Sequence, residues 1–210
     1  MKKLLIATAV SAAFAAPTLA LAQAARAPTL SQVLDASGLD VSGYIDAGYS
    51  YANRNLEGAG VTTRVFDSQN NSFDLHQFGL RVAKQPRQGF GGVVNITAGS
   101  DAQVIHAFPE QTAVAASSMF DITQAYGQYA TGSLTLMAGK FVTLAGSEVI
   151  WSPSNGNFSH SMLFGAIPFT HTGVRAGYAL SNTVTLYGGI NNGWDQLTDA
   201  NKGKTIELGA

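Results

Sequence analysis

Apolar and polar residues alternate along several segments of this chain, as they do in β-strands that have one apolar and one polar face. The clearest segment spans residues 41–51, where two sets of side chains oppose one another: Val41, Ile45, Ala47, Tyr49 and Tyr51 against Ser42, Asp46 and Ser50. The same period predicts strands around 77–82, 90–98, 174–180 and 184–190, and less regular ones at 120–130 and 133–142. An eighth strand is expected from residue 204 onward. The pattern therefore predicts an all-β chain with about eight strands.

The connections between these segments alternate between short and long. Short turns are expected at 85–88, 131–133 and 181–182, and long connections at 52–71, 100–119, 143–171 and 191–203. Outer-membrane barrels have this asymmetry, with short periplasmic turns and long external loops. We therefore expect an antiparallel transmembrane β-barrel whose first strand runs outward from the periplasm. A secreted all-β domain is the alternative, but it gives no reason for such a regular order of loop lengths.

One strand does not follow the alternation. In 133–142, the apolar residues Leu134, Leu136 and Ala138 define an outward phase that also turns Lys140 outward. A β-bulge at Gly139 would return Lys140 to the interior. Alternatively, Lys140 lies at the membrane interface and extends its ammonium group to water.

The N-terminal region has the pattern of an export signal. Lys2 and Lys3 precede an apolar stretch over 4–16 that is too short for a membrane-spanning helix, and small residues follow at Ala20 and Ala22. We expect a signal peptide over 1–22, a short periplasmic segment over 23–40 with a helix near 29–39, and an incomplete barrel over 41–210.

The composition is consistent with a chain that has little surface in water. Only 12% of the residues are charged, compared with roughly 25% in ordinary soluble domains. The net charge of -1 gives no basis for nucleic-acid binding, and the chain has no cysteine. Disulfide frameworks and cysteine-ligated metal sites are therefore excluded from these residues.

Short motifs over most of the chain, in this order and spacing, resemble those of the OmpL-like outer-membrane β-barrel porins. They are SGL at 37–39, VSGYID at 41–46, FDLHQ at 73–77, GSDA at 99–102, FDITQAY at 120–126, AGKF at 138–141, GSEV at 146–149, SNGNFS at 154–159, PFTHTGVR at 168–175 and NGWD at 192–195. The resemblance implies a channel for small hydrophilic solutes in the outer membrane of a Gram-negative bacterium. We also expect contact with outer-membrane lipid and consider assembly into a homo-oligomer, and we expect neither a cofactor nor enzymatic activity, since the sequence has no convergent catalytic set.

The resemblance further implies that the chain is the N-terminal part of a longer barrel. The interior of an eight-stranded barrel is filled by side chains, so a water-filled channel needs more strands. The alternative is a small, closed and non-conducting outer-membrane barrel with an adhesive or structural role.

A pore works through its width and the charges that line it. The polar faces of the predicted strands give a set of candidate pore-lining residues: Asp46, Arg81, Asn95, Thr97, Thr135, Lys140 and Arg175, with Thr183 and Thr185 on the same faces. Asp46 and Arg81 lie on neighbouring strands, and we expect them to pair across the lumen.

The long connection over 143–171 combines polar residues with four aromatic ones, which argues against disorder. Its candidate constriction residues are Glu148, Asn155, Asn157, His160 and His171, interleaved with Trp151, Phe158, Phe164 and Phe169. We expect the loop to fold inward, with its aromatic side chains on the wall and its polar groups facing the channel; an external lid is the alternative.

Neither a metal site nor a catalytic site is expected in this loop. Glu148, His160 and His171 lack a short metal-ligand spacing. Ser159, His160 and Ser161 are adjacent in sequence and do not form a serine–histidine pair, and the chain has no Gly-x-Ser-x-Gly elbow.

Overall fold

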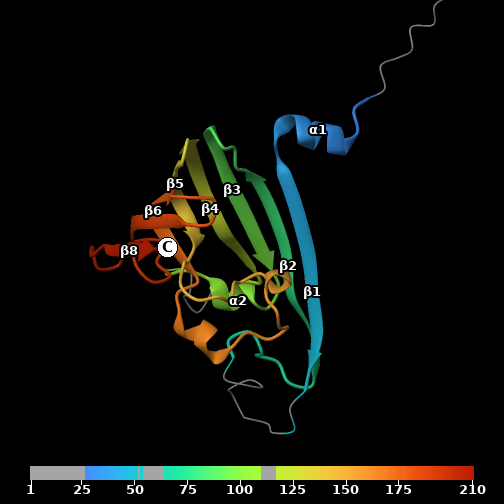
Figure 1. Ribbon diagram of the computed structural model, residues 1–210. Helices are drawn as coiled ribbons and strands as arrows, with labels where there is room; N and C mark the ends of the chain where they lie inside the picture. The colour runs from blue at the N-terminus through green and yellow to red at the C-terminus, as the bar shows by residue number, and fades with distance from the viewer. Residues whose placement is uncertain (1–26, 52, 54–63, 110–116) are drawn as a thin grey trace, which may run out of the picture.

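The structure, a computed structural model, describes residues 27–51, 53, 64–109 and 117–210. The expected signal peptide over 1–22 lies outside these residues. Eight strands make up most of the fold (Figure 1): β1 (Asp40–Ser50), β2 (Ser72–Lys84), β3 (Gly89–Ala98), β4 (Phe120–Thr131), β5 (Leu134–Val142), β6 (Thr170–Ala179), β7 (Thr185–Asn191) and β8 (Thr205–Gly209). The helices are short: α1 (Leu30–Ser37), α2 (Ala102–Ile105), and the 3-10 helices η2 (Ser152–Ser154) and η3 (Met162–Ala166).

All eight strands form one sheet in which each strand pairs antiparallel with the next in sequence. Short turns close one end of the sheet, between β2 and β3, β4 and β5, and β6 and β7, and the long connections lie at the other end. The predicted strands and the predicted order of the loops are therefore confirmed. Figure 1 shows a curved sheet in which β1 and β8 lie at opposite edges, and these two strands do not pair with each other in the described part of the chain.

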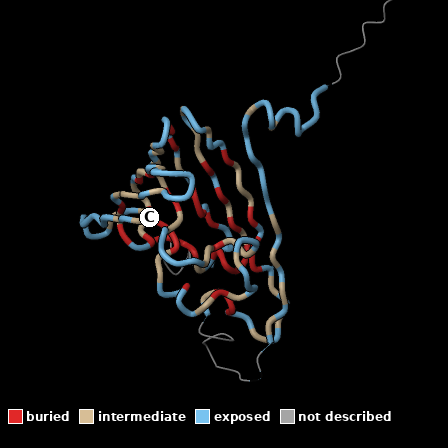
Figure 2. The backbone as a smooth tube through the Cα atoms, viewed as in Figure 1, coloured by how far each residue is buried: buried red, intermediate tan, exposed pale blue. Residues whose placement is uncertain are grey.

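The two faces of the sheet have the opposite polarity to those of a soluble β-sandwich. Large apolar side chains project from the outer face into the surroundings, among them Phe73 (85% exposed), Phe90 (81%) and Leu208 (83%). The inner face carries polar side chains that are almost fully buried, such as Gln77 and Thr97. Figure 2 shows buried residues, in red, along the strands of the sheet. A soluble domain rarely exposes so much contiguous apolar surface, whereas a sheet in lipid turns its apolar face outward.

Two β-bulges adjust the alternation so that it fits this polarity. Asp46 pairs with Gln77 and Ala47 with Leu75, which leaves His76 as the additional residue of β2. Likewise, Asn95 pairs with Gln124 and Ile96 with Ile122, which leaves Thr123 additional in β4. Each bulge places two consecutive polar residues on the buried side of the sheet, His76 with Gln77 and Thr123 with Gln124.

The expected bulge at Gly139 is wrong. The described ladders run through Gly139 without a register shift, which pairs it with Tyr126 on one side and Gly173 on the other. Lys140 therefore keeps the outward phase of its ladder partner Ala125. The alternative, an interfacial lysine, is also wrong, because Lys140 is only 6% exposed.

The position of Lys140 follows from where two strands separate. Pairing between β4 and β5 ends at Ala125 and Lys140, although β4 continues to Phe120 and β5 to Val142. The lysine side chain lies in the opening between the two strands and reaches Asp121. Gly139 accommodates this geometry with a φ of +136°, and a Cβ atom there would lie 2.3 Å from the carbonyl oxygen of Ala125.

The predicted N-terminal helix is confirmed as α1. Thr29 and Gln32 form a capping box at its start, and Gly38 ends it in the left-handed conformation at a φ of +67°. In the described part of the chain, no helix has the length and apolar character needed to cross a bilayer.

Candidate functional site

The long connections pack together at one end of the sheet. Five buried apolar side chains form a cluster there, which we call the loop core: Phe66, Ile105, Ile150, Phe164 and Phe169. The ring centroids of Phe164 and Phe169 are 5.3 Å apart, and those of Phe66 and Phe164 are 5.7 Å apart. Three connections that are far apart in sequence therefore share one hydrophobic cluster, which fixes them relative to the sheet.

The fourth long connection joins the same end through backbone bonds. The amide of Phe108 donates to the carbonyl of Asp195 at 2.7 Å, and the amide of Leu197 donates to the carbonyl of Phe108 at 2.8 Å. The carboxylate of Asp195 accepts from the amides of Phe169 and Thr170, both at 2.8 Å. Burial raises the pKa of Asp195 above its ordinary value, although these hydrogen bonds lower it in part.

Helix α2 and the residue before it bind to the inner face of β2. Asp101 accepts a hydrogen bond from Gln77 Nε2 at 2.7 Å, and its second oxygen lies 3.4 Å from His76 Nδ1. Burial raises the pKa of Asp101, against the lowering effect of these two partners. Helix α2 was not predicted, because four residues are too few to show a helical period.

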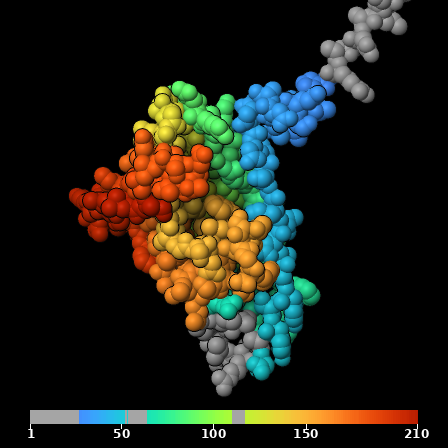
Figure 3. Space-filling view, in the orientation of Figure 1, coloured from blue at the N-terminus to red at the C-terminus, as the bar shows by residue number. Residues whose placement is uncertain are grey.

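The connection between β5 and β6 crosses the inner faces of β1 and β2. Gln77 Nε2 donates to the carbonyl of Ile150 at 2.9 Å, and the hydroxyl of Ser152 donates to the carboxylate of Asp46. The ring of Phe158 packs edge-on against the ring of His76. Figure 3 shows this connection, in orange, between β1 and the C-terminal strands. The residues 150–158 thus lie inside the curve of the sheet, as expected of a loop that folds inward.

The polar residues expected to face the channel form hydrogen bonds within the connection. The Asn155 side chain accepts from the amide of Val149 at 2.9 Å and donates to its carbonyl at 2.8 Å. His160 Nε2 lies 2.7 Å from that same carbonyl, and Glu148 accepts from the amide of Ser161 at 2.9 Å. These hydrogen bonds hold the shape of the loop. That the three side chains also face the channel stays a prediction.

The remaining residues of the predicted constriction have different environments. Asn157 is exposed. His171 is buried, with Nδ1 3.0 Å from the carbonyl of Gly193 and Nε2 3.2 Å from the hydroxyl of Thr143. Glu148, whose carboxylate accepts from Ser161, has a lowered pKa that is due first to that hydrogen bond.

Most of the predicted pore-lining residues lie on the inner face. Thr97 is fully buried and shares a hydrogen bond of 2.7 Å with Thr123, while Asn95 accepts from Gln124 at 3.3 Å. Thr135 and Asp46 are partly buried on the same face. Their contribution to solute passage stays a prediction.

The expected pair between Asp46 and Arg81 is wrong. In the strand register Arg81 lies opposite Ser42, and Asp46 lies opposite Gln77, so the two side chains are separated along the strands. Arg81 instead forms an ion pair of 2.8 Å with Asp40 at the start of β1.

Arg175 belongs to a buried group that sequence reasoning missed. Its Nη2 donates to Glu207 at 2.9 Å, and its guanidinium lies 4.1 Å above the ring of Phe141. Strand β7 lies between β6 and β8, and its residue Gly189 pairs with both Arg175 and Glu207. A Cβ atom at Gly189 would lie 2.8 Å from Glu207 Oε1. The missing side chain on β7 therefore lets charges on β6 and β8 meet across that strand.

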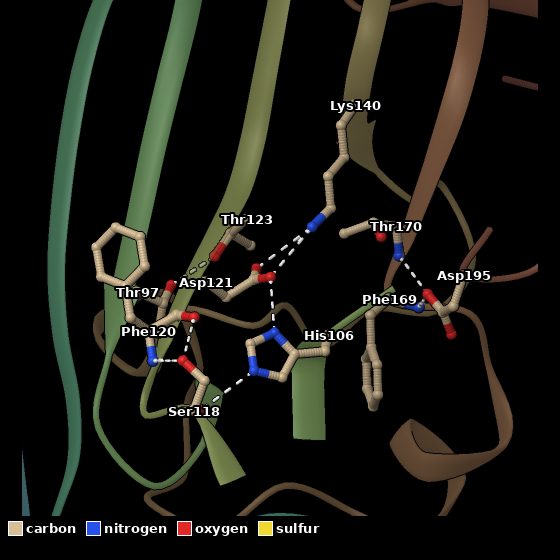
Figure 4. A network of polar contacts seen from close by, with 10 residues as sticks. All are labelled: Thr97, His106, Ser118, Phe120, Asp121, Thr123, Lys140, Phe169, Thr170 and Asp195. Atoms are coloured by element: carbon tan, nitrogen blue, oxygen red, sulfur yellow. Dashed lines mark hydrogen bonds and ion pairs between the residues drawn. The ribbon is translucent and has the colours of Figure 1, made fainter. Parts of the chain in front are cut away.

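A second buried group connects β4, β5 and the connection that follows α2 (Figure 4). The Lys140 ammonium lies 3.2 Å and 3.4 Å from the two carboxylate oxygens of Asp121. His106 Nδ1 lies 3.1 Å from Asp121, and His106 Nε2 lies 3.1 Å from the carbonyl of Ser118. Asp121 lies on the polar face of its strand, and this position alone would have made it a candidate for the inner face. Nothing in the sequence relates it to Lys140 or His106.

An antiparallel sheet that is apolar outside and polar inside, with short turns at one end and inward-packed loops at the other, defines the class of transmembrane β-barrels. The chain belongs to the family described as "Putative beta-barrel porin-2, OmpL-like", whose sequence profile matches residues 38–210. This match confirms the resemblance in the sequence motifs and the all-β barrel fold. No curated protein and no solved structure matches the chain.

Proposed function

We propose that this chain forms part of the wall of an outer-membrane porin through which small hydrophilic solutes diffuse passively. The observation that supports it best is the polarity of the sheet, with polar residues such as Asn95 and Thr97 inside and apolar residues such as Phe90 and Val94 outside. Within one strand, β3, the two kinds of side chain alternate residue by residue from Val94 to Ala98. This arrangement suits a wall between lipid and a hydrophilic interior.

The inward connection would narrow the passage at its external end. Its residues 150–158 are attached to the wall through Gln77 and Asp46 and are supported by the loop core. A loop held in this way restricts solutes by size. Two buried cations of the sheet, Lys140 and Arg175, have carboxylate partners within the wall, so we expect them to contribute little net charge to selectivity.

A second candidate function is a non-conducting barrel with an adhesive or structural role. The loop core favours it, because apolar side chains from three connections fill space at the mouth. The two candidate functions differ in whether the inserted protein conducts ions, so a conductance measurement distinguishes them directly.

The experiment is a planar-bilayer recording of the complete protein, refolded and inserted from detergent. Stepwise current increases that heat-unfolded protein and detergent alone do not produce would support the diffusion function. Protein that inserts in folded, protease-resistant form but gives no current steps would overturn it and leave the non-conducting barrel.

A further inference from the structure

A pocket of about 410 Å³ lies between the inner faces of β1–β3 and the connection that crosses them. Apart from glycines, its lining consists of Ser42, Tyr44, Arg81, Asn95, Trp151, Pro153 and Ser154. This volume lies within the range of about 300–1,000 Å³ that is typical of small-molecule sites.

The pocket is close to electrically neutral. Arg81 is the one residue of its lining that carries a formal charge, and its guanidinium is already paired with Asp40 at 2.8 Å and with Gln85. The other polar groups are hydroxyls and an amide, and Asn95 Nδ2 has only a long contact of 3.5 Å with the carbonyl of Leu80. Such a lining offers neutral donors and acceptors and little attraction for an ion.

Trp151 is held in position by bonds on both sides. The carbonyl of the preceding Ile150 accepts from Gln77 at 2.9 Å, and the hydroxyl of the following Ser152 donates to Asp46. The carbonyl of Trp151 itself accepts from Asn155 at 3.0 Å. These bonds anchor the main chain at Trp151, so the position of the residue is preorganised for binding while its ring can still adjust.

The indole N–H of Trp151 is shielded from solvent and has no hydrogen-bond partner among the described residues. A shielded donor without a partner is destabilising, because it has lost its hydrogen bonds to water. A small rotation of the ring that gives this N–H an acceptor would therefore be favourable. An oxygen of a solute in the pocket is such an acceptor.

We infer that this pocket is a binding subsite for neutral polyhydroxylated solutes, the chemical class of sugars. A sugar ring has an apolar C–H face that packs on the Trp151 indole and Pro153, and hydroxyls that exchange hydrogen bonds with Asn95 and Ser154. The inference rests on the proposed diffusion function and names the class of solute for which the passage is adapted.

The test measures block of ion current by maltose in the complete protein. We expect maltose to reduce the current with a saturable concentration dependence. Trp151→Phe, which removes the N–H but keeps an aromatic ring, should raise the half-blocking concentration about threefold to tenfold, as the loss of one hydrogen bond predicts. Trp151→Ala should raise it further, since the ring is lost.

Trp194→Phe is the matched control, because Trp194 is exposed and lies outside the pocket. It should leave the block unchanged. An open channel whose current maltose does not affect, or a Trp151→Ala block equal to that of the parent, would overturn the inference while the diffusion function stands.

A second readout does not depend on conduction. Within this sequence Trp194→Phe leaves Trp151 as the only tryptophan, so maltose should change the indole emission of the Trp194→Phe variant and not that of Trp151→Phe/Trp194→Phe. If no current is seen at all, this titration still decides whether the subsite exists. Equal responses of the two variants would overturn it.

Discussion

The buried group of Lys140, Asp121 and His106 leads to an asymmetric prediction. Asp121→Asn removes the only carboxylate that contacts Lys140 among the described residues, and leaves a buried ammonium without a counter-charge. Removing one partner of a buried ion pair costs about 3–5 kcal/mol. We therefore expect Asp121→Asn to lower the free energy of unfolding by about that amount.

Lys140→Met should cost less, because Asp121 then keeps His106 at 3.1 Å. A hydrogen bond to a charged group stabilises by about 1.5–3 kcal/mol. The retained bond to His106 therefore offsets part of the cost of losing the lysine, and we expect the free energy of unfolding to fall by about 1–3 kcal/mol. The double variant Asp121→Asn/Lys140→Met leaves neither charge buried and should be more stable than Asp121→Asn alone.

The assay is reversible urea unfolding of the folded protein in lipid vesicles or detergent, followed by tryptophan fluorescence. Equal losses for the two single variants, a loss below about 1 kcal/mol for Asp121→Asn, or strict additivity in the double variant would each refute the reasoning that the pair is buried and coupled.

Three further predictions concern the strand geometry and the loops. Gly139→Val should prevent or strongly slow folding, because its Cβ would lie 2.3 Å from the carbonyl oxygen of Ala125 at a positive φ; refolding yield from urea measures this, and a normal yield would contradict it. Burial raises the pKa of Asp195 above 3.8, so the folded state binds this proton more tightly than the unfolded state, and stability decreases as the pH rises from about 4 through the raised pKa. Asp195→Asn should flatten that slope in urea titrations between about pH 4 and pH 7, and an unchanged slope would exclude Asp195 as its source. Glu148→Gln should weaken the bond from Ser161 and shift single-channel ion selectivity toward anions; identical reversal potentials would show that this part of the loop does not line the passage.

The regular features of the fold could be predicted because they are local. A strand with one apolar face repeats every two residues, so the alternation in 41–51 and 90–98 was enough to locate β1 and β3 and to place Asn95 and Thr97 on the inner face. The order of long and short connections likewise needs no knowledge of strand register.

The features that were missed depend on register. The bulges at His76 and Thr123 break the two-residue period, and no single strand shows where its neighbour will shift. The wrong pairing of Asp46 with Arg81 has the same origin, since adjacent strands alone do not say which residues lie opposite each other.

The position of Lys140 could not be predicted from its strand alone. The alternation gave its phase, but the opening between β4 and β5 and the carboxylate of Asp121 within that opening are set by three-dimensional packing. The loop core was missed for a similar reason, because Phe66, Ile105 and Phe164 come from three separate connections.

The central claim is that the sheet separates lipid from a hydrophilic interior, and spin-label accessibility along β5 tests it most directly. The sequence has no cysteine, so single cysteines can be introduced and labelled at Thr135, Leu136, Met137 and Ala138 in the complete protein in lipid vesicles. We predict that labels at Leu136 and Ala138 collide mainly with oxygen dissolved in the bilayer, and that labels at Thr135 and Met137 collide mainly with a water-soluble nickel chelate. Equal access of both reagents to all four positions, or the opposite alternation, would contradict the account.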